Sequence, residues 1–149
     1  GNLNETLLAQ LNALSFYGVL GAKSLGRESI DQSFIPLLDQ SGLSPKDQLC
    51  TLVEHFAIQI AALIRTHSSK DTPSVLLTGG GAYNRYFVER LDQHLNQQWV
   101  QVEASKELVE FKEALIFAFL GVLKLRGEAN ALASVTGATR DSSGGIVFG

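Results

Sequence analysis

The feature that most constrains the fold of this chain is a short apolar segment followed at once by three glycines. Residues 74–78 read Ser-Val-Leu-Leu-Thr, and residues 79–84 read Gly-Gly-Gly-Ala-Tyr-Asn. A short apolar, β-branched run is typical of a buried strand, and the spacing from Tyr83 to Asn96 predicts a helix. Because glycine has no side chain, this turn leaves the backbone open to approach and permits angles that other residues resist.

A strand, glycine turn and helix in this order can bind an anion. The first turn of a helix presents unpaired backbone N–H groups and the positive end of the helix dipole. A tight turn needed only for packing is the other explanation, but three consecutive glycines favour nucleotide contact at Gly79, Gly80 and Gly81. Asn84 stands at the helix start, where it would either cap the helix or donate a hydrogen bond to a ribose or phosphate.

Composition narrows the class of protein. The 149 residues are enough for one domain with a sizeable core, and 45% hydrophobic with 18% charged residues is globular. A net charge of -3 argues against nucleic acid as a partner. The single cysteine, Cys50, excludes an intrachain disulfide, and its apolar surroundings predict a core thiol. Without a disulfide framework or cleavable leader, we expect a cytoplasmic protein.

The rest of the chain alternates helices with strands. The apolar run 114–123 is too short to cross a bilayer, so no membrane contact is expected. Strands mixed with helices indicate an α/β architecture, but two strands and a possible third make a small or incomplete sheet. Together with the absence of methionine, this suggests a piece of a longer molecule. The second strand is expected at Trp99–Val102 and a loop at Phe16–Arg27. The expected helices are Leu3–Leu14, Glu28–Leu38 (or ending at Pro36), Ser44–His67 with Ser44 as its cap, and Phe111–Arg126.

Glu113 is the second candidate site residue. It begins the apolar run at residues 114–120, in the first turn of a helix expected to be buried on most sides. A carboxylate at that position can simply complement the helix dipole. The functional alternative is that Glu113 projects into a cleft and accepts hydrogen bonds from a ligand such as a sugar hydroxyl.

The sequence lacks the residue patterns of metal sites, of nucleophilic catalysis and of P-loops. His55, His67 and His94 have no helical i, i+4 ligand partner, so no metal site is expected. The sequence has neither a nucleophile elbow nor the Gly-Lys-Ser/Thr ending of a P-loop. A phosphate would therefore be bound by another design.

The glycine turn also fits part of a dinucleotide-binding fingerprint. Gly79 and Gly81 match the first two glycines of G-x-G-x-x-G, and Glu103 follows the next strand at about the distance of a ribose-binding acid. Against this alternative, Asn84 stands in place of the third glycine. The half of the chain before the turn is also helical, whereas that fold usually opens on a strand.

Four segments in register resemble one enzyme family. The glycine turn resembles the adenosine-side motif of the sugar kinase, actin and heat-shock ATPase superfamily. The set of four, which covers nearly the whole chain, resembles the C-terminal part of the anhydro-N-acetylmuramic acid kinases. The segments are Lys23–Glu28, Gly79–Asn84, Phe111–Leu120 and Ala133–Ala138.

The resemblance implies a fold and a reaction. The fold would be α/β, of the actin-like ATPase (ribonuclease H-like) type, with a small mixed sheet flanked by helices. Residues 1–149 would be a single domain, the C-terminal lobe of a longer two-lobed kinase. Such a cytoplasmic enzyme of cell-wall recycling uses ATP and water, with Mg²⁺, to open the 1,6-anhydro ring of anhydro-N-acetylmuramic acid and yield the 6-phosphate.

The resemblance also assigns residues. Gly79, Gly80, Gly81 and Asn84 would bind the nucleotide, and Glu113 would face the sugar. The family's catalytic aspartate and first phosphate-binding loop have no counterpart here, so the chain should carry half a site, with weak nucleotide affinity and no turnover. A non-catalytic nucleotide-binding or interaction module remains an alternative, and uncovered apolar surface would allow a homo-oligomer.

Overall fold

The computed structural model describes residues 1–21 and 23–148. These residues form two compact units. The first unit comprises Gly1–Gly18 and Leu25–Glu110, and the second comprises Val19–Ser24 and Phe111–Gly149. Ala22 in the expected loop and Gly149 at the chain end lie outside the described residues. The expectation of a single domain over residues 1–149 stays a prediction.

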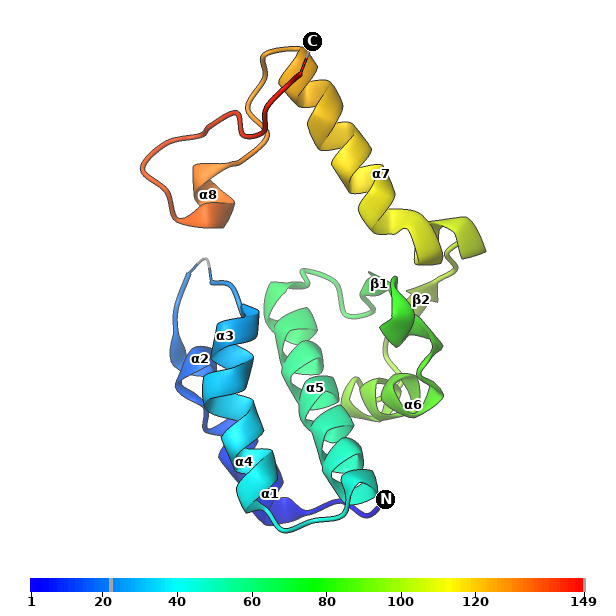
Figure 1. Cartoon of the computed structure of the whole chain (residues 1–149). Helices are drawn as coiled ribbons and strands as arrows, with labels where there is room; N and C mark the ends of the chain where they lie inside the picture. The colour runs from blue at the N-terminus through cyan, green and yellow to red at the C-terminus, as the bar shows by residue number, and fades with distance from the viewer. Residues whose placement is uncertain (22, 149) are drawn as a thin grey trace. The chain divides into compact units, whose positions relative to one another are not determined.

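The fold is mixed α/β and mostly helical (Figure 1). Two short strands, β1 (Ser74–Leu76) and β2 (Val100–Val102), lie in the first unit. A 3-10 turn at Gly80–Tyr83 follows β1, and a π-helical turn at Ile30–Phe34 lies between α3 and α4. The helices are α1 (Glu5–Asn12), α2 (Ser15–Gly18), α3 (Arg27–Ser29), α4 (Ile35–Gln40), α5 (Pro45–His67), α6 (Arg85–His94), α7 (Lys106–Leu125) and α8 (Ala133–Thr136).

The long helix α5 is the centre of the first unit. Its predicted start is confirmed, because the Ser44 hydroxyl accepts a hydrogen bond from the N–H of Asp47 and Pro45 opens the first turn. One face of α5 packs against α1 and another against α6 (Figure 1). Ala57 and Ala61 are fully buried. Ala61 forms an apolar cluster with Leu91 of α6 and with Leu95, the residue that follows this helix.

The sheet differs from the expected mixed sheet. Within the described residues it has two strands, which run parallel with Ser74 opposite Val100 and Leu76 opposite Val102. The connection from β1 to β2 passes through α6. A helical crossover carries the chain back to the starting edge of the sheet, so the second strand runs parallel to the first.

In the first 40 residues one expectation needs correction, and the structure decides between the two predicted ends of the second helix. The short helix α2 occupies Ser15–Gly18, where part of a loop was expected. Pro36 does not end the second predicted helix, because the helical path continues to Gln40. The N–H of Ile35 bonds to the carbonyl of Ile30, five residues back. This wider turn accommodates a proline, which has no N–H and whose ring crowds the preceding turn.

The predicted start and burial of α7 were wrong. The helix begins at Lys106, five residues before Phe111, because the Ser105 hydroxyl caps it by accepting from the N–H of Leu108. The apolar run is exposed: Leu115 is 61% exposed and Phe117 is 72% exposed. An apolar composition predicts that a helix packs against other apolar surface, but it does not identify which part of the structure provides that surface.

The second unit is held by Asn130. Its side-chain amide donates to the carbonyl of Leu120 on α7, at 3.2 Å, and accepts from the N–H of Gly144, at 2.7 Å. An antiparallel bridge joins Ala131 to Ser142. These bonds lay the C-terminal segment along the end of α7.

Length and composition single out one helix as a candidate membrane span among the described residues. That helix is α5, and a third of its most apolar window is buried. A core helix meets the same criterion, so this observation is weak.

Candidate functional site

The glycine turn is open on its outer side. A Cβ atom at Gly79, Gly80 or Gly81 would meet no atom within 4 Å. Gly79 has φ +76°, in the left-handed region that favours glycine, and its N–H donates to the carbonyl of Val109 at 3.1 Å. The three glycines therefore have different roles: the first is required by the backbone, and the other two leave space.

The glycine turn itself presents free donors. Within the described residues, the N–H groups of Gly80 and Gly81 have no hydrogen-bond acceptor. The helix predicted to start at Tyr83 begins two residues later, since the 3-10 turn at Gly80–Tyr83 comes first and α6 begins at Arg85. The short turn closes with bonds from Ala82 to Gly79 and from Asn84 to Gly81.

Asn84 performs the capping role that the sequence allowed. Its Oδ1 accepts from the N–H of Phe87 at 3.1 Å, which satisfies one of the unpaired donors at the start of α6. With the oxygen used in this way, the Nδ2 group remains as the donor of the side chain. The residue also borders a groove beside the turn.

This groove has a volume of about 530 Å³ and lies within the first unit. Its walls are mostly apolar, with Thr78 and Asn84 as the polar side chains. Apolar walls with a few polar groups are typical of small-molecule sites of this size. The lining residues are Val53, Phe56 and Ile60 of α5, Leu76 of β1, Leu77, Thr78, Gly81, Ala82, Asn84, and Phe87 of α6.

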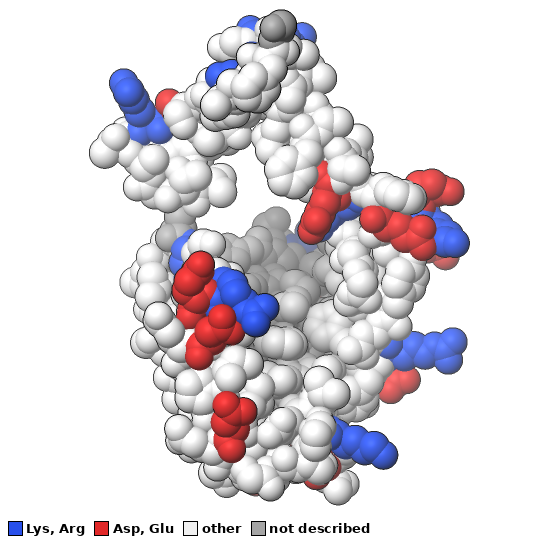
Figure 2. Space-filling view, viewed as in Figure 1, with Lys and Arg blue, Asp and Glu red and all other residues white. Residues whose placement is uncertain are grey.

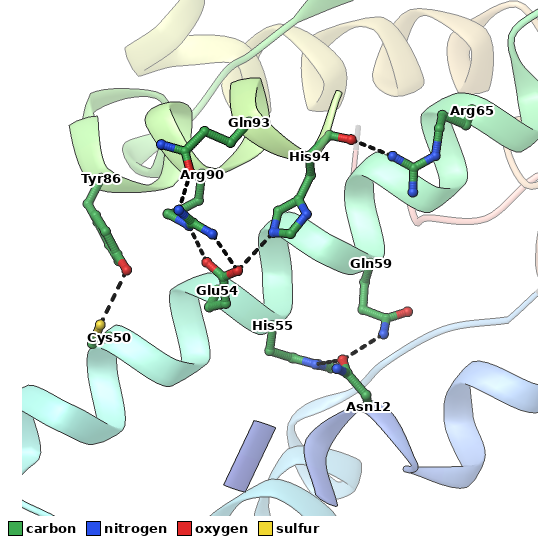
Figure 3. Close-up of polar contacts among 10 residues, drawn as sticks. All are labelled: Asn12, Cys50, Glu54, His55, Gln59, Arg65, Tyr86, Arg90, Gln93 and His94. Carbon is green, nitrogen blue, oxygen red and sulfur yellow. Dashed lines mark hydrogen bonds and ion pairs between the residues drawn. The ribbon is translucent and has the colours of Figure 1, made fainter. Parts of the chain in front are cut away.

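A buried ionic cluster joins α5 to α6 close to this groove (Figure 3). Glu54, only 3% exposed, accepts hydrogen bonds from Nε and Nη2 of Arg90, the latter at 2.8 Å. His94 Nε2 lies 2.8 Å from the same carboxylate. The Arg90 guanidinium lowers the pKa of Glu54 below its ordinary value, and the carboxylate raises the pKa of Arg90. Sequence reasoning missed this cluster.

A second buried network surrounds His55 (Figure 3). The Asn12 side-chain oxygen accepts from Gln59 and from His55 Nδ1, at 3.0 and 2.7 Å. His55 Nε2 therefore accepts from the Tyr17 hydroxyl, 2.7 Å away. Burial lowers the pKa of His55 to about 4. His55 is thus a neutral hydrogen-bonding group of the core.

Cys50 was expected in the core and is instead half-buried. Its sulfur lies 3.3 Å from the Tyr86 hydroxyl of α6 (Figure 3). The hydrogen bond to Cys50 is the main cause that raises the pKa of Tyr86 to about 12.

Glu113 is exposed on the part of α7 that belongs to the second unit. It lies more than one turn beyond Lys106, so the dipole explanation of its position was wrong. The acidic residue in the first turn is Glu107. No group within the described residues hydrogen-bonds to the Glu113 carboxylate.

Two basic residues of the Lys23–Glu28 segment make local surface contacts. Arg27 pairs with Asp31 at 2.9 Å on the surface, and Lys23 donates to the carbonyl of Val19 at 3.2 Å. Figure 2 shows acidic and basic side chains interspersed on its visible face, without a broad basic area. The described residues contain no group of three or more His, Cys, Asp or Glu that could hold a metal ion.

Comparison with known proteins assigns a family. A family model described as anhydro-N-acetylmuramic acid kinase matches residues 1–149. Curated relatives of that name include proteins of Variovorax paradoxus (strain S110) and Vibrio parahaemolyticus serotype O3:K6. The Variovorax protein is 36% identical over the whole of this chain, which covers 39% of that protein's length. The Vibrio protein is 33% identical over 99% of this chain, and the match covers 40% of that protein's length. The chain thus spans about two fifths of the length of these relatives.

Proposed function

Because the chain belongs to the anhydro-N-acetylmuramic acid kinase family, we propose that it supplies the nucleotide-binding part of an ATP-dependent sugar kinase. The observation that carries this proposal is the open glycine turn beside an apolar groove of about 530 Å³. Family membership also favours this function over the dinucleotide-binding alternative, in which Glu103 would bind a ribose.

The groove suits the base of a nucleotide. A purine is flat and apolar on its faces, and Phe56, Ile60 and Phe87 offer apolar surface to it. The phosphates would lie toward the unpaired N–H groups of Gly80 and Gly81, where a side chain would obstruct them. Asn84 would contribute its Nδ2 group to the ribose or phosphate while its oxygen continues to cap α6.

The reaction we propose for the whole protein uses ATP and water to open the 1,6-anhydro ring of anhydro-N-acetylmuramic acid and produces the 6-phosphate. No catalytic residue is assigned to this chain. Glu113 would accept hydrogen bonds from the sugar, since its exposed carboxylate is not engaged by its own helix. Mg²⁺ would accompany the phosphates of ATP, because this ion is usually bound through substrate phosphates and one or two carboxylates.

The proposal extends to architecture and location. The βαβ arrangement of β1, α6 and β2 is compatible with one lobe of an actin-like kinase fold. Phosphoryl transfer depends on groups that converge on the transferred phosphate, so a second lobe would complete the site. A cytoplasmic location and the capacity to form a homo-oligomer belong to the same proposal.

A binding measurement tests the nucleotide site. We expect the 149-residue chain to bind a fluorescent ATP analogue weakly, and Gly80→Val to reduce that affinity by about tenfold because a branched side chain would fill the approach to the turn. Gly18→Val is the matched control, since a Cβ there also meets open space, but away from the groove. Equal affinity of the Gly80→Val variant and the unsubstituted chain would contradict the proposal.

An activity measurement tests the kinase assignment. The chain would replace its matched segment in the Variovorax paradoxus relative, and ATP-dependent phosphorylation of anhydro-N-acetylmuramic acid would be followed. We expect an active chimera that loses activity on Gly80→Val. A chimera that binds ATP without turnover would favour the non-catalytic module instead.

A further inference from the structure

The contact between α5 and α6 points to a role for the buried ionic cluster beyond stability. We propose that the Glu54–Arg90 pair positions α6 against α5 and thereby sets the width of the groove beside the glycine turn. This inference rests on the proposed function of the groove as a nucleotide site. Glu54 and Arg90 would be positioning residues, since neither lines the groove.

The first argument is location. The groove lies between Val53 and Phe56 of α5 on one side and Phe87 of α6 with its N-cap residue Asn84 on the other. Glu54 lies between Val53 and Phe56 in the sequence, and Arg90 follows Phe87 by three residues, about one helical turn on the same face. Any shift of α6 that breaks the Glu54–Arg90 pair would therefore move Phe87 relative to Phe56.

The second argument is that the pair is directional. Glu54 accepts from two nitrogens of Arg90, and this bidentate geometry fixes both the distance and the orientation of the two side chains. The Glu54 side chain is 4% exposed and that of Arg90 is 25% exposed. An unpaired charge at so buried a position is strongly unfavourable, so the pair holds its geometry tightly.

Two further hydrogen bonds join these helices, from Cys50 to Tyr86 and from Arg65 to the carbonyl of His94, but the apolar contacts constrain the helices less. Ala61, Leu91 and Leu95 form an apolar cluster, and apolar contacts are non-directional. Beyond the groove the glycine turn has its own anchor, the bond from Gly79 to Val109. The Glu54–Arg90 pair would fix α6 against α5, and the Gly79–Val109 bond would fix the glycine turn. Together these contacts would keep the groove between them at a constant width.

The cluster also supplies a matched control. His94 Nε2 lies 2.8 Å from the Glu54 carboxylate that Arg90 also contacts. In α6, His94 follows Arg90 by four residues and is therefore one turn farther from Phe87. Removing His94 leaves the bidentate Glu54–Arg90 contact in place. A positioning role predicts that Arg90 affects the groove and His94 does not.

The test measures the affinity of the 149-residue chain for fluorescent ATP and adenosine analogues at a temperature where circular dichroism shows it to be folded. We expect Glu54→Gln and Arg90→Lys each to weaken both analogues by the same factor, about tenfold, because the base would lose its fit while the phosphate donors remain. His94→Gln should change either affinity by less than about twofold. A purely structural role would leave the affinity of the folded variants unchanged.

The outcomes separate this inference from the proposed function. Affinities of Glu54→Gln and Arg90→Lys equal to that of the unsubstituted chain would overturn the positioning role while leaving the nucleotide site intact. Loss of the folded circular dichroism signal in both variants would assign the pair to stability alone and also overturn it. Failure of the unsubstituted chain to bind either analogue would overturn both proposals.

Discussion

The backbone N–H of Gly79 donates a hydrogen bond of 3.1 Å to the carbonyl oxygen of Val109, the buried residue of α7. This bond anchors the first glycine of the turn, whereas Gly80 and Gly81 keep unpaired N–H groups and open space at their Cβ positions. Three glycines that look equivalent in the sequence are therefore under different constraints.

Substitution of the glycines should separate these constraints. Gly79→Ala should lower the free energy of unfolding by about 1 kcal/mol or more, because its φ of +76° is unfavourable for alanine. Gly80→Ala should change it by less than about 0.5 kcal/mol, since φ is ordinary and no atom is near. Urea denaturation measures both, and equal losses would show that strain is not confined to Gly79.

Asn84 should reveal its two roles through two substitutions. Asn84→Ala removes the cap on Phe87 and should cost about 1 kcal/mol of stability. Asn84→Asp keeps a capping oxygen and stability, but it places a negative charge beside the groove and should weaken ATP binding. Denaturation and fluorescence titration give the two readouts. Unchanged ATP affinity in Asn84→Asp would limit Asn84 to capping.

His55 should make the first unit sensitive to acid. Its pKa is about 4 in the folded chain and about 6.5 in the unfolded chain, so the unfolded state binds the extra proton first as pH falls. Stability should therefore decrease as pH is lowered from 6.5 to 4, by roughly 3 kcal/mol at most. Denaturation at several pH values measures the slope.

Substitution of His55 tests the cause of this pH dependence. His55→Gln should flatten the slope between pH 6.5 and 4 and lower stability at pH 7. A slope that survives His55→Gln would assign the acid sensitivity to other groups. Glu54, whose pKa is lowered, adds a further loss only as pH falls below its ordinary value near 4.3.

Glu113 should matter for activity and not for folding. Because it is exposed and lies beyond the first turn of α7, Glu113→Gln should change stability by less than about 0.5 kcal/mol. In the chimeric kinase the same substitution should reduce phosphorylation of the sugar. Glu110→Gln, which removes a carboxylate from the same helix, is the control and should leave activity intact. Equal activity of the two variants would remove Glu113 from the sugar site.

The apolar surface of α7 should cause self-association of the isolated chain. Phe117 and Leu125 are each more than 70% exposed in the second unit. Sedimentation velocity should show association that rises with concentration and that decreases in Phe117→Glu. Leu20→Glu, at a residue 95% exposed but outside α7, should have no comparable effect. A chain that stays monomeric at all concentrations would contradict this prediction.

Local patterns in the sequence determined much of the fold. Ser44, Pro45 and Asp47 predicted the start of α5, and the glycine turn located β1 and α6 to within a few residues. Such signals can be read because a cap or turn involves residues three or four apart. The start of α7 was missed, although Ser105 is itself a capping residue, because the apolar run further along dominated the pattern.

Only the tertiary structure decided which polar side chains meet. Glu54 lies 36 residues from Arg90 and 40 from His94, and periodicity places each on a helix face without identifying the facing helix. The same reason explains α7, whose apolar composition predicts a buried face although its side chains are exposed here. The sequence alone indicated the family, the helices α5 and α6 and the glycine turn, because these depend on neighbouring residues. The groove and the buried ionic cluster depend on how distant helices pack, which is settled by the free energy of the whole fold.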